Sequence, residues 1–150
     1  SADEMLNACK ETMKNIVDVF IGAAAVSDFK TAVCHNQKIK KQDCKNKFLL
    51  ELVHTPDIIA ILAEKKLAHY IVGFAAETKN ILEYAKNKLA HKGLDMIIAN
   101  DVSKNDIGFN SHENQVMVMT KNKIWYSRKT KKSILASDLV NNIAEFSLKK

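Results

Sequence analysis

Residues 69–99 decide the fold class of this chain, and they read HYIVGFAAETKNILEYAKNKLAHKGLDMIIA. The apolar runs at 69–75 and 94–99 predict two strands, and three apolar residues at helical spacing between them predict a helix. Thr78 is the expected cap of that helix, and Gly93 is expected to end it. A strand, a helix and a second strand in direct succession are typical of a parallel sheet covered by helices.

The same alternation continues on both sides of this unit. Upstream, Pro56 is expected at the first position of a helix that Thr55 caps. Downstream, Lys121-Asn122 separates two apolar runs and predicts an antiparallel hairpin. The further elements expected are helices at 2–17, 55–66 and 133–146 and strands at 18–25, 48–54, 115–120 and 123–127. The predicted fold class is α/β: a Rossmann-like, mostly parallel sheet flanked by helices, with a C-terminal antiparallel hairpin.

The composition fits one globular domain and excludes several classes of protein. The chain has 150 residues and only four glycines, so a glycine-rich phosphate loop cannot be built from them. No apolar run approaches the roughly 18–20 residues that span a bilayer. The acidic start, Asp3-Glu4, lacks the basic region of a signal peptide. Three cysteines without a CxxC pair favour reduced thiols and a cytoplasmic location.

The net charge of +6 suggests an anionic partner. Nucleic acid, a nucleotide, a phosphorylated metabolite and a membrane surface all remain open on charge alone. The lysines and arginine near 121–132 favour nucleic acid most, but the two aromatic residues among them form no known binding motif. We therefore expect neither a nucleic-acid partner nor a membrane partner.

Ligands of such folds bind at the carboxyl ends of the strands, and three segments follow those ends. Small residues at 22–25 would let a ligand reach the backbone, with Asp28 able to hold a cation; a strand ending in a turn is the alternative. Phe74 is a possible wall for a base, or a core residue. Asn100 and Asp101 offer polar groups, although such residues are common in turns for local reasons.

Two groups of lysines are unusually dense. Residues 38–41 read KIKK, and like charges repel unless an anion lies among them. Lys88 and Lys92 stand four residues apart on one helix face, where a bound anion would relieve their repulsion. A solvated loop and a solvated helix face are the alternatives. Cys34 and His35 are adjacent, but residues side by side in a loop do not define a nucleophile and its base.

Taken together and in order, these segments resemble one family. They are GAAAVSDF (22–29), KIKK (38–41), TPDI (55–58), VGFAAET (72–78), ANDV (99–102) and GFN (108–110). In this order they resemble phosphopantothenoylcysteine synthetase of the CTP-using bacterial type. In bacteria it is usually the C-terminal domain of a bifunctional coenzyme A biosynthesis protein. The resemblance extends from about residue 3 to 146.

The resemblance implies a ligase that joins 4′-phosphopantothenate to L-cysteine. CTP activates the carboxylate as an acyl-cytidylate and releases pyrophosphate, and the cysteine amine then displaces CMP. The implied cofactor is Mg²⁺ or Mn²⁺, and FMN belongs to a separate decarboxylase domain of the parent protein. The family also implies a homodimer, for which the hairpin at 115–127 is the expected place of pairing.

The resemblance also implies roles for particular residues. Lys38 corresponds to the phosphate-contacting lysine that matters most for activation. Asp28 corresponds to an aspartate associated with the nucleotide and the metal ion. Asn100 and Asp101 mark a possible substrate region. The residues implied to contact the nucleotide are Gly22, Ala23, Ala24, Asp28, Lys38, Pro56, Asp57, Ile58, Ile59, Phe74, Lys88 and Lys92.

The chain departs from the family pattern at its start. The family's domain opens with a glycine-rich strand, loop and helix and a segment of the type Asn-x-Ser-Ser-Gly, and neither is present. We therefore expect residues 1–150 to be a single unit, the C-terminal portion of this domain, and incomplete as a catalyst alone. A CTP-binding fragment without complete activity is the main alternative, and a basic nucleic-acid-binding module is a weaker one.

Overall fold

The computed structural model describes residues 1–40, 47–103 and 111–150. Its helices are α1 (Ala2–Thr12), α2 (Ile58–Glu64), α3 (Ile81–His91) and α4 (Lys132–Ser147). The central sheet is formed by β1 (Val17–Gly22), β4 (Ala68–Glu77), β5 (Met96–Asp101), β7 (Val116–Thr120) and β8 (Ile124–Tyr126). Two small ribbons pair β2 (Phe29–Thr31) with β3 (Leu52–His54) and β6 (Glu113–Asn114) with β9 (Thr130–Lys131).

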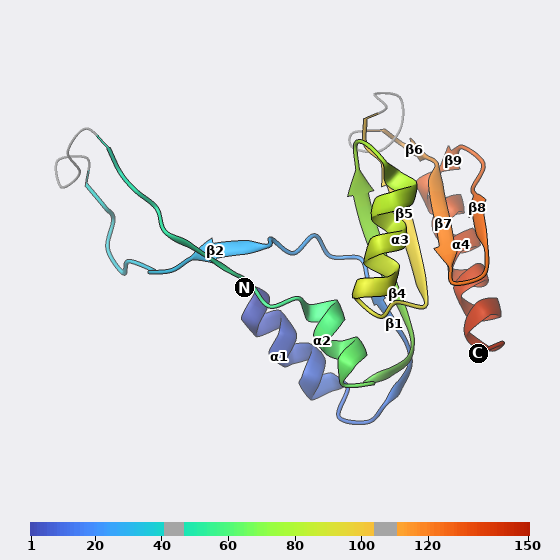
Figure 1. The fold of residues 1–150 in the computed structure, drawn as a ribbon, viewed down its shortest axis with the longest axis horizontal. Coiled ribbons are helices and arrows are strands. Elements are labelled where there is room, and N and C mark those ends of the chain that lie inside the picture. Colours follow the sequence, from blue (N-terminus) through green and yellow to red (C-terminus); the bar gives the residue numbers. More distant parts are fainter. Residues whose placement is uncertain (41–46, 104–110) are drawn as a thin grey trace.

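The central sheet has the strand order β1-β4-β5-β7-β8 (Figure 1). β1, β4 and β5 are parallel, whereas β7 is antiparallel to β5 and β8 is antiparallel to β7. Because the three parallel strands share one direction, their carboxyl ends meet at one edge of the sheet. The predicted α/β fold class and the C-terminal hairpin are confirmed.

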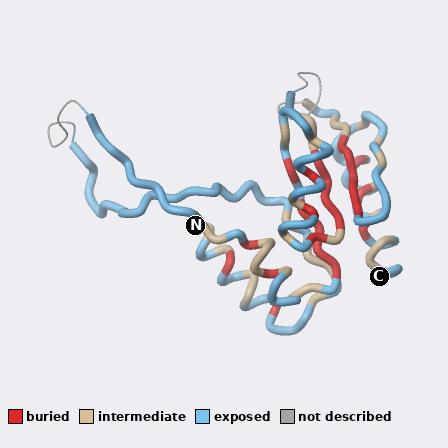
Figure 2. Tube along the Cα trace, in the orientation of Figure 1, coloured by how far each residue is buried: buried red, intermediate tan, exposed pale blue. Residues whose placement is uncertain are grey.

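Helices cover both faces of the sheet, and Figure 2 shows the buried residues concentrated in its central strands. On one face, Val72, Ile98 and Val118 pack against Leu135 and Leu139 of α4. The opposite face packs against α3, with Ala85 and Leu89 turned toward the sheet. This alternation along the strands assigns every residue of the sheet to the α4 face or the α3 face.

A third apolar cluster joins α1 and α2 beside β1. Its buried members are Leu6 of α1, Met13 directly after α1, and Ile58 and Leu62 of α2. The sequence predicted that α1 reaches residue 17, but the helix ends at Thr12. Val17 instead donates its backbone N–H to the carbonyl of Leu67 and starts the pairing of β1 with β4. Sheet pairing therefore ends the helical pattern five residues early.

Residues 29–54 include an antiparallel arm that extends away from the body (Figure 1). The sequence predicted a loop at 27–47 and a strand at 48–54, whereas β2 and β3 are three residues each and pair only at the base of the arm. The rings of Phe29 and His54 lie 4.8 Å apart there. The ion pair between Lys30 and Asp3 joins this base to α1.

Both predicted helix caps differ from those in the structure. α2 begins at Ile58, and its cap is Asp57, whose carboxylate accepts the N–H of Ala60 at 3.2 Å. The Thr55 hydroxyl donates instead to the carbonyl of Ser27. α3 follows Asn80 rather than Thr78, because β4 continues to Glu77 and pairs there with β5. The predicted caps were wrong because Thr55 bonds to the loop at Ser27, and because Thr78 directly follows β4, before α3 begins.

Other sequence expectations agree with the structure. Gly93 follows the end of α3 at a φ of +64°, a backbone conformation that suits glycine. Met117 and Met119 of the predicted strand 115–120 are buried in the core. Lys41, Cys44 and the segment 108–110 lie outside the described residues. Within the described ranges, no helix is long and apolar enough to cross a lipid bilayer.

Candidate functional site

The carboxyl edge of the parallel strands brings together three of the predicted segments. β1 ends at Gly22, β4 at Glu77 and β5 at Asp101 (Figure 1). Gly22 pairs with Gly73, and Glu77 pairs with Asp101, so these strands are in direct hydrogen-bonded register. α2 and α3 lie beside this edge on one face of the sheet. The edge is the candidate ligand site.

The two lysines of α3 are each paired with a carboxylate. The Nζ atom of Lys88 lies 2.7 Å from Oε1 of Glu77, and Nζ of Lys92 lies 2.9 Å from Oδ2 of Asp57. The sequence suggested that a bound anion would relieve their mutual repulsion, but these carboxylates already do so. Glu77 is the residue that sequence reasoning missed, because its contact with Lys88 arises from the packing of β4 against α3.

Asp57 has two roles at this edge. Its Oδ1 atom caps α2, and its Oδ2 atom pairs with Lys92 of α3. The carboxylate of Asp57 therefore links the start of α2 to the end of α3, and both helices cover the same face of the sheet. Asp57 and Lys92, two of the residues that the resemblance implied, are thus joined by an ion pair, and Ile58 and Ile59 lie in the adjoining first turn of α2.

Gly22 is required by packing. A Cβ atom at Gly22 would lie 2.5 Å from Cδ1 of Ile59 in α2. The Ile59 side chain therefore occupies the space that a larger residue at position 22 would need. Ala23 and Ala24, which follow, are exposed. The small residues at this strand end therefore allow close approach of α2 at Gly22, and leave accessible backbone at Ala23 and Ala24.

Phe74 lies on the face opposite the lysine pairs. It alternates with Val72, which packs against α4, and it pairs with Ile98 of the same cluster. Its side chain is 40% exposed, so it is not a core residue. A ligand that contacts both Phe74 and the lysines of α3 must lie across the carboxyl edge.

Asn100 and Asp101 end β5 on opposite faces. Asp101 accepts the backbone N–H and the hydroxyl of Ser103 through Oδ1, which is the local turn that the sequence offered as an alternative. Asn100 lies on the α4 face, and its Oδ1 atom is buried without a hydrogen-bond partner among the described residues. Asn100 is therefore the unexplained polar group of this edge.

Lys38 does not join the other predicted residues. It belongs to residues 32–40, the cyan segment that follows β2 in Figure 1 and extends away from the sheet. Asp28 lies at the inner end of the arm, where its carbonyl accepts the N–H of Thr55. In the described part of the chain, no three side chains of the His, Cys, Asp and Glu types come close enough to hold a metal ion.

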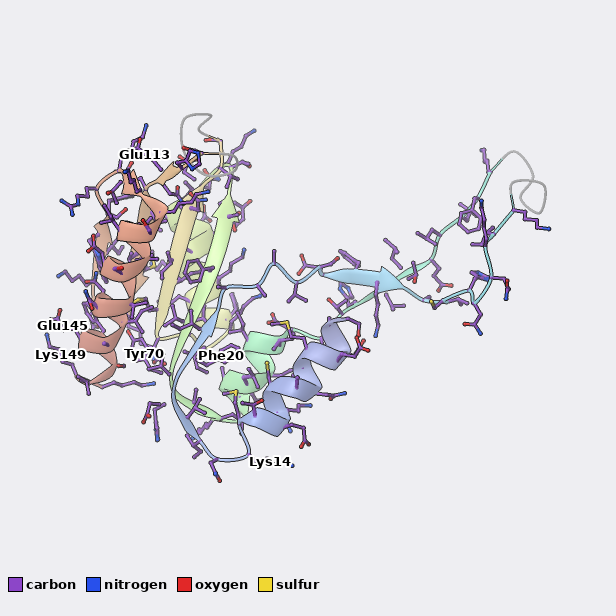
Figure 3. The ribbon with its side chains drawn as sticks, turned by 180° about the vertical axis from the view of Figure 1, so that it is seen from behind. Lys14, Phe20, Tyr70, Glu113, Glu145 and Lys149 are labelled. Atoms are coloured by element: carbon purple, nitrogen blue, oxygen red, sulfur yellow. The ribbon has the colours of Figure 1, made fainter. Side chains whose placement is uncertain are left out.

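Tyr70 and Glu145, which lie outside the edge, have shifted pKa values. Burial beneath α4, reinforced by Asp95, raises the pKa of Tyr70 to about 12 (Figure 3). At the exposed end of α4, the hydrogen bond from Lys149 lowers the pKa of Glu145. Neither group is among the residues predicted for the site.

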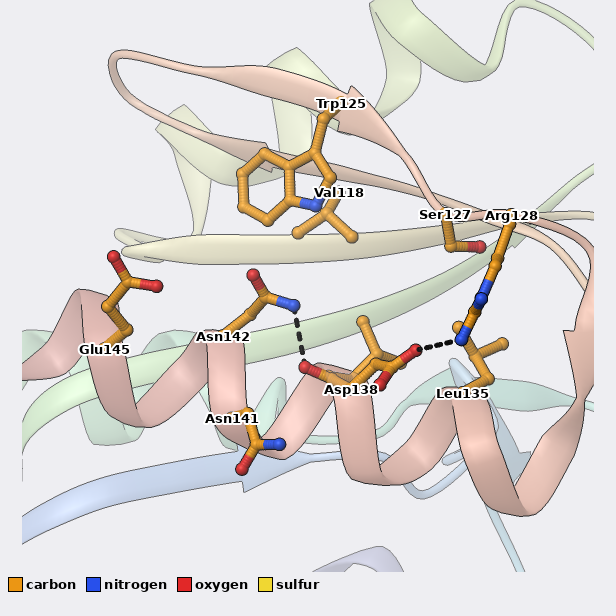
Figure 4. A pocket seen from close by; sticks show the side chains of 10 residues that line it. Val118, Trp125, Ser127, Arg128, Leu135, Asp138, Asn141, Asn142 and Glu145 are labelled. Atoms are coloured by element: carbon orange, nitrogen blue, oxygen red, sulfur yellow. Dashed lines mark hydrogen bonds and ion pairs between the residues drawn. The ribbon is translucent and has the colours of Figure 1, made fainter.

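A shallow pocket of about 290 Å³ lies between α4 and the β7–β8 hairpin (Figure 4). Trp125 forms one wall, Val118 and Leu135 contribute its apolar floor, and Asp138 faces Arg128 at 4.0 Å. None of the residues predicted from the sequence lines this pocket. It is separate from the candidate site at the carboxyl edge.

The fold first defines a class: the molecule is a Rossmann-like α/β domain in which two lysines at α3 pair with carboxylates, one at the end of β4 and one at the start of α2. The family follows from a direct match. Residues 1–147 match the family model of the DNA/pantothenate metabolism flavoprotein C-terminal domain, and the chain belongs to this family.

Similar proteins extend this match. The chain is 44% identical over 147 residues to the coenzyme A biosynthesis bifunctional protein CoaBC of Haemophilus influenzae, covering 97% of this chain and 36% of that protein. It is 47% identical over 104 residues to CoaBC of Bacillus subtilis, covering 69% of this chain and 25% of that protein. The chain thus spans about a third or less of these relatives.

Solved structures share the fold. The C-terminal domain of CoaBC superposes with a TM-score of 0.77 at 31% identity, covering 100% of this chain and 64% of that one. A Cab2 mutant in complex with phosphopantothenate-cysteine superposes with a TM-score of 0.69 at 20% identity, covering 99% of this chain and 52% of that one, a likeness of fold alone.

Proposed function

We propose that this chain is part of a phosphopantothenate–cysteine ligase that uses CTP in coenzyme A biosynthesis. The observation that carries the proposal is the 44% identity with CoaBC along nearly the whole chain. In this reaction the carboxylate of 4′-phosphopantothenate attacks the α-phosphate of CTP, and pyrophosphate leaves. The amine of L-cysteine then attacks the acyl carbon, forms the amide and releases CMP.

The carboxyl edge supplies the charges that such a reaction needs. Lys88 and Lys92 place two ammonium groups on one helix face, each held by a carboxylate. A triphosphate competes for these ammonium groups, which then offset the charge that develops on the leaving pyrophosphate. Phe74, Ala23 and Ala24 line the same edge and are accessible to the nucleoside.

A divalent cation, Mg²⁺ or Mn²⁺, is part of this proposal, and a single protein carboxylate is enough to bind it beside the substrate phosphates. Mg²⁺ is commonly held by one or two carboxylates together with substrate phosphates, so a cluster of three protein ligands is not required. Asp28, at the exit of the first parallel strand, is the carboxylate proposed to hold it. When bound, the cation would neutralise phosphate charge beside the lysines.

Lys38 is proposed to act in a second copy of the chain. Within one chain it lies in the arm, apart from Lys88 and Lys92. Both strands of the arm carry exposed apolar side chains, which indicates a protein surface that is covered by another molecule. They are Val26, Phe29, Val33, Ile39, Phe48, Leu49, Leu50, Leu52 and Val53. A homodimer would cover them and bring the arm of one copy to the edge of the other.

A preceding segment of the parent protein is proposed to extend the sheet. Within the described residues, the outer edge of β1 has no strand partner, and Ile21 at its end is 42% exposed. An open, apolar parallel edge favours the addition of a strand. The chain covers 64% of the solved CoaBC domain, which leaves room for such a segment.

The activation step provides the test of this function. The parent protein, with its preceding segment, is incubated with CTP and 4′-phosphopantothenate but without cysteine. Pyrophosphate should form only when both substrates are present, and CTP should be preferred over ATP. The alternative, a CTP-binding fragment without chemistry, predicts that CTP binds in calorimetry while no pyrophosphate forms.

A further inference from the structure

The side-chain oxygen of Asn100 is a buried acceptor without a donor. Among the described residues, no group donates a hydrogen bond to this Oδ1 atom. Buried polar atoms in folded proteins are nearly always paired, because leaving one unpaired costs the full loss of its hydration. An unpaired acceptor at the end of a strand therefore calls for an explanation.

The neighbours of Asn100 in the sheet offer no donor. It stands between Ala76 of β4 and Val116 of β7, and both side chains are apolar. The backbone N–H of Val116 already donates to Oγ of Ser127 at 3.0 Å. The next residue, Asp101, has an acceptor side chain that is occupied by Ser103. The donor must therefore come from outside these strands.

Two residues near Asn100 on its face of the sheet are exposed to solvent. Asn100 follows Ile98 by two residues on the α4 face, and Phe74 shares that face one ladder step away. Phe74 is 40% exposed, and Ala76 between the two residues is also exposed. Asn100 as a whole is only partly buried, so it borders these exposed positions although its Oδ1 atom is covered.

We propose that Asn100 is a specificity-determining residue whose side-chain carbonyl accepts a hydrogen bond from an N–H group of a bound substrate. This inference rests on the proposed function and names a contact within that site. Two substrates carry a suitable group: CTP through the amino group of cytosine, and 4′-phosphopantothenate through its amide. The lysine pairs of α3 lie on the opposite face, so Asn100 contacts a different part of the bound molecules.

The test compares three substitutions. Asn100→Leu keeps the size of the side chain and removes both polar atoms, and Asn100→Ala serves if the leucine variant fails to fold. Asn100→Asp retains the acceptor oxygen and loses the amide N–H. Calorimetric titration of this chain with CTP and with UTP, and of the parent protein with 4′-phosphopantothenate, is combined with the thermal unfolding midpoint of each variant.

The apolar variants should bind one of the two substrates at least about tenfold more weakly, the factor expected for the loss of one enclosed hydrogen bond. Their unfolding midpoint without ligand should be equal or higher, because an unpaired polar atom has been removed. Asn100→Asp should bind within about threefold of the unsubstituted protein. Loss of the preference for CTP over UTP identifies cytosine as the donor, whereas weaker 4′-phosphopantothenate binding with CTP unchanged identifies the amide.

Unchanged affinities for both substrates in the apolar variants would overturn the inference. The inference would also be overturned if Asn100→Asp lost as much substrate affinity as Asn100→Leu, since the acceptor oxygen would then not be the recognised atom. A parent protein that forms no pyrophosphate from CTP would contradict the proposed function. The CTP titration of this chain would still report on Asn100, so the two failures are distinguishable.

Discussion

Gly22 shows how a residue implied in ligand contact is also fixed by packing. The sequence pointed to close approach at this strand end, and the structure identifies Ile59 as the group that approaches. Pattern analysis could find the small residue but not its neighbour, because the contact joins β1 to α2 across 37 positions of sequence. The same holds for the lysine pairs. The spacing of Lys88 and Lys92 was visible in the sequence, whereas their carboxylate partners were identified only from the structure.

The Gly22→Ala substitution tests this packing. The added methyl group would meet Cδ1 of Ile59, and relieving the clash should lower the free energy of unfolding by about 1–3 kcal/mol. Urea unfolding followed by circular dichroism measures the change. The double substitution Gly22→Ala with Ile59→Val removes the clashing methyl and should recover part of the loss. Equal stability of all three proteins would contradict the contact.

The Lys92→Met substitution separates the catalytic and structural roles of the ion pair with Asp57. Both partners are partly exposed, so the free energy of unfolding should fall by less than about 1 kcal/mol. Pyrophosphate release by the parent protein should fall at least about tenfold, because a charge on the leaving group is left uncompensated. Lys86→Met, an exposed lysine on the same helix, is the control and should leave turnover unchanged. Equal turnover in both variants would exclude Lys92 from the site.

The raised pKa of Tyr70 should lower the free energy of unfolding at high pH. Its pKa is raised to about 12 in the folded protein, mainly by burial, against 10 in the unfolded chain. Between pH 10 and 12 the unfolded chain loses this proton while the folded protein keeps it, so stability falls as pH rises. Two pKa units correspond to at most about 2–3 kcal/mol. Tyr70→Phe should show a shallower fall from pH 9 to 12 in urea unfolding, and identical slopes would contradict the shift.

At the scale of elements, the apolar periodicity identified most of the fold, and the irregular connections hid the rest. The central strands, α3 and α4 were all predicted, since each buries a regular apolar face. In the arm, residues 27–47 were expected as a loop and 48–54 as a strand. β2 was missed because its three residues are all exposed and lack the alternation that reveals a strand, and β3 occupies only the last three residues of the predicted strand. The caps of α2 and α3 were misplaced because tertiary contacts decided between nearby polar residues.

The arm should control association of the chain rather than its folding. Phe48→Ser with Leu50→Ser makes two exposed positions polar at a distance from the core. The thermal unfolding midpoint of a dilute sample should stay within a few degrees of the original. The mass in sedimentation equilibrium should shift from dimer to monomer, because the apolar area available for association is reduced. Exposed Leu82→Ser on α3 is the matched control and should remain dimeric.

At the scale of the whole molecule, the candidate site is divided between two places. The sheet and the helices beside it hold Asp57, Phe74, Lys88 and Lys92, while Lys38 belongs to the segment between β2 and β3. The resemblance named all these residues without indicating that they lie apart, because sequence order carries no distance. A site completed by the arm of a second copy and by a segment before β1 accounts for the separation, the exposed arm and the open sheet edge together.

The formation of phosphopantothenoylcysteine by the parent protein tests the central claim most directly. The protein is supplied with 4′-phosphopantothenate, L-cysteine, Mg²⁺ and either CTP or ATP, and the amide product and nucleoside monophosphate are quantified by mass spectrometry. We expect one CMP per amide formed with CTP and far less product with ATP. Absence of product with CTP, or amide formation without CMP, would contradict the central claim.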